Sequence, residues 1–349
     1  MTDALVEYDV AARVKPNTGP TIGQLPLTGL AIRHILVPLD GSPEAESVLP
    51  YVEDIASAFS ARVTLLRAVE VGPDVPGRRV DALEWELARV ESHAYLAAVA
   101  ARLAKNGLTA NIELVQGHAA EQILLLARRQ AVDVIALATH GHGHAHAGAI
   151  GTTVQRVIAG APTSVLIVPG RDVPGASRGE IRLRRMFLPL DCSQRAEFIL
   201  PAATDLARRH HAELILAHVV LEPELPRRMG PSQEDLELAK ALTERNRRAA
   251  LRYLRDIQNR LKPVAEQVEV RVCVASRRSQ ALRELAERED VDLLILSAHG
   301  NTGDAHQRYG GVAAKLLQDC PRPIIMLQDI ADADDDRHGD SYAEAHLGR

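Results

Sequence analysis

The chain carries the same sequence pattern twice. The stretch HILVPLDGSPEAESVLPYVEDIA begins at His34, and RMFLPLDCSQRAEFILPAATDLA begins 151 residues later at Arg185. Each copy is an apolar run that ends in Pro-Leu-Asp and continues with apolar residues at the i, i+3, i+4, i+7 spacing of one helix face. In the first copy, Ser42-Pro43 predicts the helix start, with serine as N-cap and proline at the first helical position. A repeat of this length indicates a duplicated domain and excludes a solenoid of short units.

The later parts of the two halves also correspond. ARVTLLRAVE matches AELILAHVVL, VDVIALATHG matches VDLLILSAHG, and TSVLIVP matches RPIIMLQ. These runs are almost continuously apolar, which is typical of parallel strands covered on both faces. The segments 81–106 and 233–261 have a helical pattern and are expected to cover the sheet. Each half is therefore predicted to be an α/β domain with a doubly wound parallel sheet of about five strands.

The repeat also predicts how the chain is divided. We expect domains at 31–170 and 181–329, joined by a Pro- and Gly-rich linker at 171–180. Residues 1–30 are expected to form a flexible N-terminal arm, with an arm docked on the fold as the alternative. Residues 330–349 are an acidic, weakly apolar tail for which we expect disorder.

Composition narrows the class of protein. The net charge of -5 is spread over the chain, which argues against a nucleic-acid binder acting through a basic surface. We expect neither a signal peptide nor a membrane span, because no apolar stretch has the required length, and we therefore expect a cytoplasmic protein. The cysteines Cys192, Cys273 and Cys320 form no Cys-x-x-Cys motif and are expected to be structural thiols in a reducing compartment.

Candidate binding residues follow the predicted strands. Ligands of open parallel sheets bind outside the carboxyl ends of the strands, where the strand order reverses. There an acid such as Asp40 can accept ribose hydroxyls, while glycines and threonines at a helix start can donate to phosphates. The pattern therefore indicates a nucleotide site. In the first half it is formed by Pro38, Leu39, Asp40, Ala68, Ala138, His140, Gly141, Gly151, Thr152 and Thr153.

Residues 32–328 resemble two tandem universal stress protein domains, whose nucleotide motif is Gly-x2-Gly-x9-Gly-(Ser/Thr). In the first half Gly141, Gly151 and Thr152 match this motif, and Ala138 replaces its first glycine. The resemblance implies Rossmann-like domains of the adenine nucleotide α-hydrolase-like type. It also implies a pseudo-dimer that pairs through the last strands, 164–168 and 323–327. ATP, with or without Mg²⁺, is the cofactor implied, and a homodimer of two tandem chains is a compatible further assembly.

The second half departs further from the motif. Ser297 stands at the first glycine, and Gly310 is followed by Gly311 where the motif has a hydroxyl-bearing residue. Asp304 lies in the intervening loop, where it can repel phosphate. We therefore expect a weaker or empty second site. Its residues are Pro189, Asp191, Val219, Ser297, His299, Gly300, Gly310 and Gly311.

Several residues admit a structural alternative. Asp40 and Asp191 can act as caps of the following helices, and Thr152 can act as an N-cap. The alternating histidines His140, His142, His144 and His146 fit a solvated loop, a loop that crosses bound phosphates, or a metal site.

Four functions compete on these grounds. We expect a stress-response regulator that binds ATP, has no catalytic residues we can assign, and is at most a weak ATPase. The alternatives are an enzyme that acts on nucleotide phosphates, a His-rich metal-binding protein, and a structural pseudo-dimer without ligands.

Overall fold

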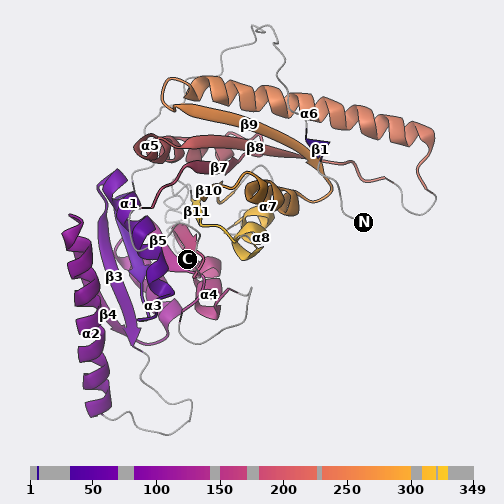
Figure 1. Cartoon of the computed structure of the whole chain (residues 1–349). Coiled ribbons are helices and arrows are strands. Elements are labelled where there is room, and N and C mark those ends of the chain that lie inside the picture. The colour runs from indigo at the N-terminus through magenta and orange to yellow at the C-terminus, as the bar shows by residue number, and fades with distance from the viewer. Residues whose placement is uncertain are drawn as a thin grey trace, which may run out of the picture.

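A computed structural model describes most of both halves of the chain. The described residues are 6–7, 32–69, 82–141, 150–170, 181–225, 230–299, 309–319 and 321–328. They form one continuous, mostly parallel sheet with helices on both faces, as Figure 1 shows. The predicted α/β class and the division into two similar units are therefore confirmed.

The first domain alternates strands and helices. Its strands are β2 (His34–Pro38), β3 (Arg62–Val69), β4 (Ala110–Gln116), β5 (Val134–Ala138) and β6 (Ser164–Val168). Its helices are α1 (Leu49–Phe59), α2 (Ala82–Lys105), α3 (Ala119–Arg129) and α4 (Thr152–Gly160). The spatial order of the strands is β4-β3-β2-β5-β6, so the order reverses between β2 and β5.

The second domain repeats this arrangement. Its strands are β7 (Arg185–Pro189), β8 (Glu213–Leu221), β9 (Gln267–Ala275), β10 (Leu293–Ser297) and β11 (Ile324–Leu327). Its helices are α5 (Leu200–His210), α6 (Gln233–Leu261), α7 (Arg278–Arg288) and α8 (Gly311–Asp319). The order β9-β8-β7-β10-β11 reverses between β7 and β10.

The final strands of the two domains join the sheets. β6 and β11 pair antiparallel, with Leu166 opposite Ile325 in the register. Alternate residues of β6 face opposite sides, so Leu166 belongs to the core beneath α1, α2, α5 and α6. Its neighbour Ile167 belongs to the core beneath α3, α4, α7 and α8. The predicted pseudo-dimer is therefore confirmed, and each apolar core runs through both domains.

A second contact between the domains is polar. Helices α1 and α5 pack on one another, and Asp54 of α1 lies 3.0 Å from Nε of Arg209 and 2.6 Å from Nε2 of His210. The side chains of Asp54 and His210 are each only 10% exposed. This contact fixes the two helices side by side across the domain boundary.

The helix predicted from Pro43 starts later than the sequence indicates. A 3-10 turn, η1 (Ala45–Val48), comes first, and α1 begins at Leu49. Pro50 has no N–H to donate to the carbonyl of Glu46, so the N–H of Leu49 donates to that carbonyl and closes a tighter turn. The second domain has the same 3-10 turn, η2 (Arg195–Ile199), ahead of Pro201.

Part of the N-terminal segment docks on the sheet. Strand β1 (Val6–Glu7) pairs antiparallel with β9 at the outer edge of the second domain. The docked arrangement, which was the alternative to a flexible arm, therefore applies to these two residues. The other residues of the arm, the linker 171–180 and the tail 330–349 lie outside the described residues.

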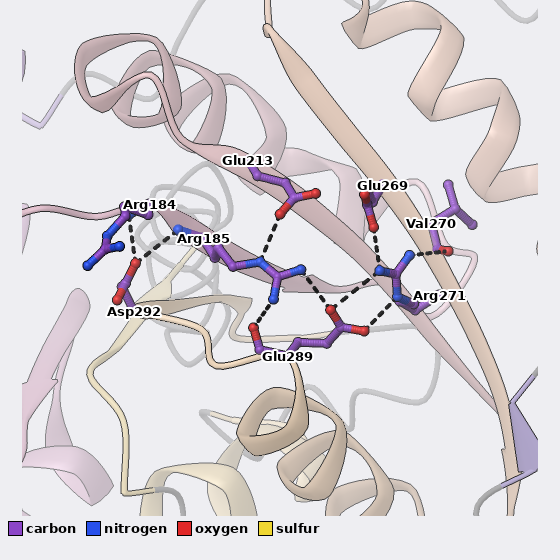
Figure 2. A network of polar contacts seen from close by, with 8 residues as sticks. All are labelled: Arg184, Arg185, Glu213, Glu269, Val270, Arg271, Glu289 and Asp292. Carbon is purple, nitrogen blue, oxygen red and sulfur yellow. Dashed lines mark hydrogen bonds and ion pairs between the residues drawn. The ribbon is translucent and has the colours of Figure 1, made fainter. Parts of the chain in front are cut away.

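An ion-pair network ties three strands of the second domain to the end of α7 (Figure 2). Arg185 donates to Glu213 and Glu289 at 2.8 Å each, and Arg271 donates to Glu289 at 2.6 Å and also pairs with Glu269. Burial raises the pKa of Glu289, but the two arginines outweigh it and lower that pKa overall. The side chain of Glu289 is 10% exposed, so removal of its carboxylate would leave two guanidinium groups without their shared partner.

The first domain fills the same place with a less charged network. His34 Nε2 lies 2.8 Å from the hydroxyl of Thr64, and Arg62 donates to the carbonyl of Gln130 at 3.1 Å. The Gln130 amide donates to Glu113 at 2.9 Å. Burial lowers the pKa of His34, and the Arg62 charge acts in the same direction.

Candidate functional site

Asp40 borders the switch point of the first domain, which is the place between β2 and β5 where the strand order reverses. This residue follows β2, and its Oδ1 accepts hydrogen bonds from the N–H of Ser42 at 2.9 Å and from the Ser42 hydroxyl at 2.6 Å. The same hydroxyl accepts a bond from the N–H of Ala45 at 3.1 Å. Asp40 thus holds the turn that leads into η1, but the N-cap of η1 is Glu44, so the helix-cap alternative for Asp40 is wrong. One carboxylate oxygen is committed to this turn.

The other oxygen of Asp40 faces Gly141 across the switch point. A Cβ added to Gly141 would lie 2.0 Å from Oδ2 of Asp40, a distance that no side chain can occupy. The glycine therefore allows the segment after β5 to approach the acid after β2. Two of the residues predicted from motif spacing are in this way brought together.

The start of α4 is fixed beside the end of β5. The N–H of Gly151 donates to the carbonyl of Thr139 at 2.9 Å, and Gly151 is the N-cap of α4. The Thr139 hydroxyl accepts the N–H of Gly170 at 2.9 Å and lies 2.9 Å from Nδ1 of His140. Thr152 is the first helical residue, and the N-cap makes no side-chain bond, so the N-cap alternative for Thr152 is wrong. Thr152 and Thr153 both lie in the first turn of the helix.

A cation that was not predicted lies beside the first site. Arg67 comes near the end of β3, before Ala68, and its guanidinium lies 5.3 Å from the ring centre of Tyr95. A Cβ on Gly41 would lie 3.1 Å from its Nη1. Arg67 forms no hydrogen bond or ion pair with other described residues. A positive charge next to the turn of Asp40 favours an anionic ligand.

The second domain keeps the acid but changes the turn. Asp191 Oδ1 accepts the N–H of Ser193 at 3.1 Å and its hydroxyl at 2.6 Å. Cys192 occupies the place of Gly41 and has a φ of 67°, which is strained for a residue with a side chain. Its Sγ lies 3.5 Å from Nδ1 of His218, the counterpart of Arg67.

A cavity of about 120 Å³ opens at the switch point of the second domain. Strands β7, β8 and β10 and helices α7 and α8 contribute to its walls. All the described residues predicted for the second site line it: Pro189, Asp191, Val219, Ser297, His299, Gly310 and Gly311. Arg278, at the start of α7, also lines it and was not predicted.

The side chains of His218 and Cys192 near this cavity are held in neutral forms. Burial lowers the pKa of His218. A hydrogen bond to the Leu190 carbonyl raises this pKa, the charge of Arg278 lowers it, and the pKa is lowered overall. Burial, together with the charge of Asp191, raises the pKa of Cys192 to about 11. A neutral imidazole therefore lines the cavity with a protonated thiol 3.5 Å from it, and a nucleophilic thiolate is disfavoured.

Some predicted residues cannot be placed. His142, His144, His146, Gly300, Asp304 and Cys320 lie outside the described residues. Within the ranges that are described, no three metal-ligating side chains form a cluster. The same ranges contain no helix with the length and apolarity needed to cross a bilayer.

Comparisons with known proteins agree with the duplicated fold. The model of the universal stress protein family matches residues 31–169 and 182–328. A universal stress protein of Thermus aquaticus is 33% identical over 139 residues, which are 39% of this chain and 98% of the relative. One from Mycolicibacterium smegmatis is 24% identical over 302 residues, 84% of this chain and 96% of the relative. The crystal structure of a universal stress protein from Archaeoglobus fulgidus has a TM-score of 0.58 at 16% identity, covering 86% of this chain and 99% of that one.

Proposed function

Because this chain belongs to the universal stress protein family, we propose that it is a stress-response regulator that binds adenine nucleotides, ATP above all, with or without Mg²⁺. The first domain holds the better site. Binding changes the contacts that the protein makes with its partners, and turnover is slow or absent.

The observation that carries this proposal is the contact between Asp40 and Gly141. An acid after the first strand of such a sheet suits ribose hydroxyls, and glycine backbone at the neighbouring strand end lets phosphates approach. Gly151 and Thr152 begin α4 next to this contact, so the helix dipole and a hydroxyl favour the phosphates. Arg67 adds a positive charge without an ion-pair partner among the described residues.

The two sites are ranked by expected ATP affinity from the residues that begin α4 and α8. The first domain has the hydroxyl of Thr152 where the second has Gly311. The second domain therefore lacks one donor for a phosphate oxygen, although its cavity is well formed. We propose that ATP binds there more weakly.

Titration calorimetry with ATP tests both parts of the proposal. Asp40→Ala should weaken ATP binding by about one to two decades, since lost hydrogen bonds to charged groups cost roughly 1.5–3 kcal/mol. Asp191→Ala should weaken it less. Asp205→Ala removes a half-buried acid that pairs with Arg208 on α5, and it serves as a control that leaves binding unchanged. Equal losses, or a larger loss at Asp191, would reverse the ranking, and absence of ATP binding would refute the function.

Two further proposals concern the setting of the protein. We place it in the cytoplasm, which fractionation of cells with an antibody to the chain would test. Light scattering with and without ATP would show whether two tandem chains form a homodimer. Release of inorganic phosphate from ATP measures turnover, which we expect to be near background.

A further inference from the structure

The cavity of the second domain has a cation where the first domain has an alanine. Arg278 is the first residue of α7, and Ala119 is the first residue of the equivalent helix α3. Arg278 makes no hydrogen bond or ion pair with the residues that the structure describes. Guanidinium N–H donors that line a cavity without acceptors of their own favour a ligand that supplies acceptors.

Strand order places Arg278 on the side of the cavity away from α8. The order is β9-β8-β7-β10, and Arg278 follows β9 while Gly310 and Gly311 follow β10. Asp191 follows β7, between them. A nucleotide with its phosphates at the start of α8 and its ribose at Asp191 therefore has its base on the Arg278 side.

The size of the cavity limits how much of a ligand it can enclose. Its volume is about 120 Å³, and its walls include Ala217, Val219, Leu282 and Leu296. An apolar cavity of roughly 150 Å³ holds benzene, so this smaller one encloses only one edge of a purine and leaves the rest of the base, the sugar and the phosphates outside. This edge of the base enters a mostly apolar space with one guanidinium at its wall.

We propose that Arg278 is a specificity-determining residue, which makes the second domain prefer a 6-oxopurine nucleotide over an adenine nucleotide. Arginine donates two parallel hydrogen bonds to adjacent acceptors such as O6 and N7 of guanine or hypoxanthine. Adenine presents N7 next to an amino group, whose hydrogens oppose those of the guanidinium. The first domain has Ala119 at this place, and its own arginine, Arg67, is near the end of β3 and lies over the Tyr95 ring, so it keeps its preference for adenine. This inference rests on the proposed nucleotide-binding function.

Inosine and adenosine monophosphates are the matched probes, because their bases differ chiefly at ring position 6. The experiment uses the full chain carrying Asp40→Ala, which weakens the first site. Calorimetry should show that inosine monophosphate binds about five- to tenfold more tightly than adenosine monophosphate. This preference is in the lower part of the range for a bidentate arginine–base pair, because Arg278 is exposed and water competes for its donors. Arg278→Ala should abolish this preference, and Arg278→Lys should reduce it because a lysine keeps the charge but lacks the fork.

Arg283→Ala is the matched control, since Arg283 lies on the same helix, pairs with Glu287 and is not part of the cavity. It should leave the preference unchanged. Equal or tighter binding of adenosine monophosphate would overturn the inference, and so would a preference that survives Arg278→Ala. Failure of both probes to bind the Asp40→Ala chain would also overturn it. If the unmodified chain still binds ATP in that case, the proposed function stands, and if it binds no nucleotide, both fail.

Discussion

Gly141→Ala tests the contact on which the first site depends. Gly141 does not have a positive φ, so its backbone accepts alanine and any effect arises from the added methyl group. That methyl group would lie 2.0 Å from Oδ2 of Asp40, and the carboxylate must rotate away. Asp40 then loses its two hydrogen bonds from Ser42, at 2.9 and 2.6 Å. Because Asp40 is exposed, water replaces part of this, and we expect a stability loss of about 1–2 kcal/mol.

Gly141→Ala should also weaken the binding of ATP. Calorimetry should show binding to the first domain weakened by about ten- to a hundredfold, since the displaced carboxylate no longer meets the ribose. Asp205→Ala, on α5 and away from both sites, is the control and should leave this binding unchanged.

A double-mutant cycle identifies the cause. In an Asp40→Ala background the carboxylate is absent, so Gly141→Ala should add little to the cost in either stability or affinity. The same cost in both backgrounds would show that the methyl group acts on something other than Asp40. Binding of ATP by Gly141→Ala at unchanged affinity would refute the geometry proposed for the site.

Three other predictions concern stability. The pKa of His34 is lowered in the folded state, so the first domain should lose stability as the pH falls below about 6.5, where the unfolded chain binds the proton more readily; His34→Gln should flatten this dependence in thermal unfolding from pH 8 to 5. Glu289→Gln leaves two arginines without their shared partner, and urea unfolding should show a loss of about 2–3 kcal/mol; an unchanged midpoint would contradict a stabilising network. Asp54→Ala removes the contacts to Arg209 and His210 between α1 and α5, and limited proteolysis should cleave between the domains faster than in the parent chain.

Much of the fold could be predicted because buried parallel strands leave long apolar runs. The strands that were located, such as Ile35–Val37 and Val165–Val168, are covered on both faces. Strand β4 was not located, because it lies at the outer edge of the sheet and its residues are half-exposed. Its counterpart β9 was missed for a similar reason, since most of its residues are only partly buried.

The residues of the candidate site could be predicted only where they belong to a motif with fixed spacing. Asp40, Gly141 and Gly151 belong to a motif with fixed intervals, and the structure brings the first two into contact. Arg67 and Arg278 do not belong to a motif with fixed intervals. Arg278 follows β9, the strand that the sequence did not reveal, so nothing in the sequence related it to the cavity.

The antiparallel pairing of β6 with β11 has a consequence for how the two halves can change over evolutionary time. When two identical subunits pair through one edge, every substitution appears on both sides, and assembly depends on concentration. Here one polypeptide supplies both edges, so the effective concentration of each for the other is set by the connecting chain and is independent of expression level. A substitution such as an arginine in place of Ala119 or an alanine in place of Arg278 alters one half alone. The duplicated chain can therefore combine two differently tuned binding surfaces in an assembly that dilution does not separate.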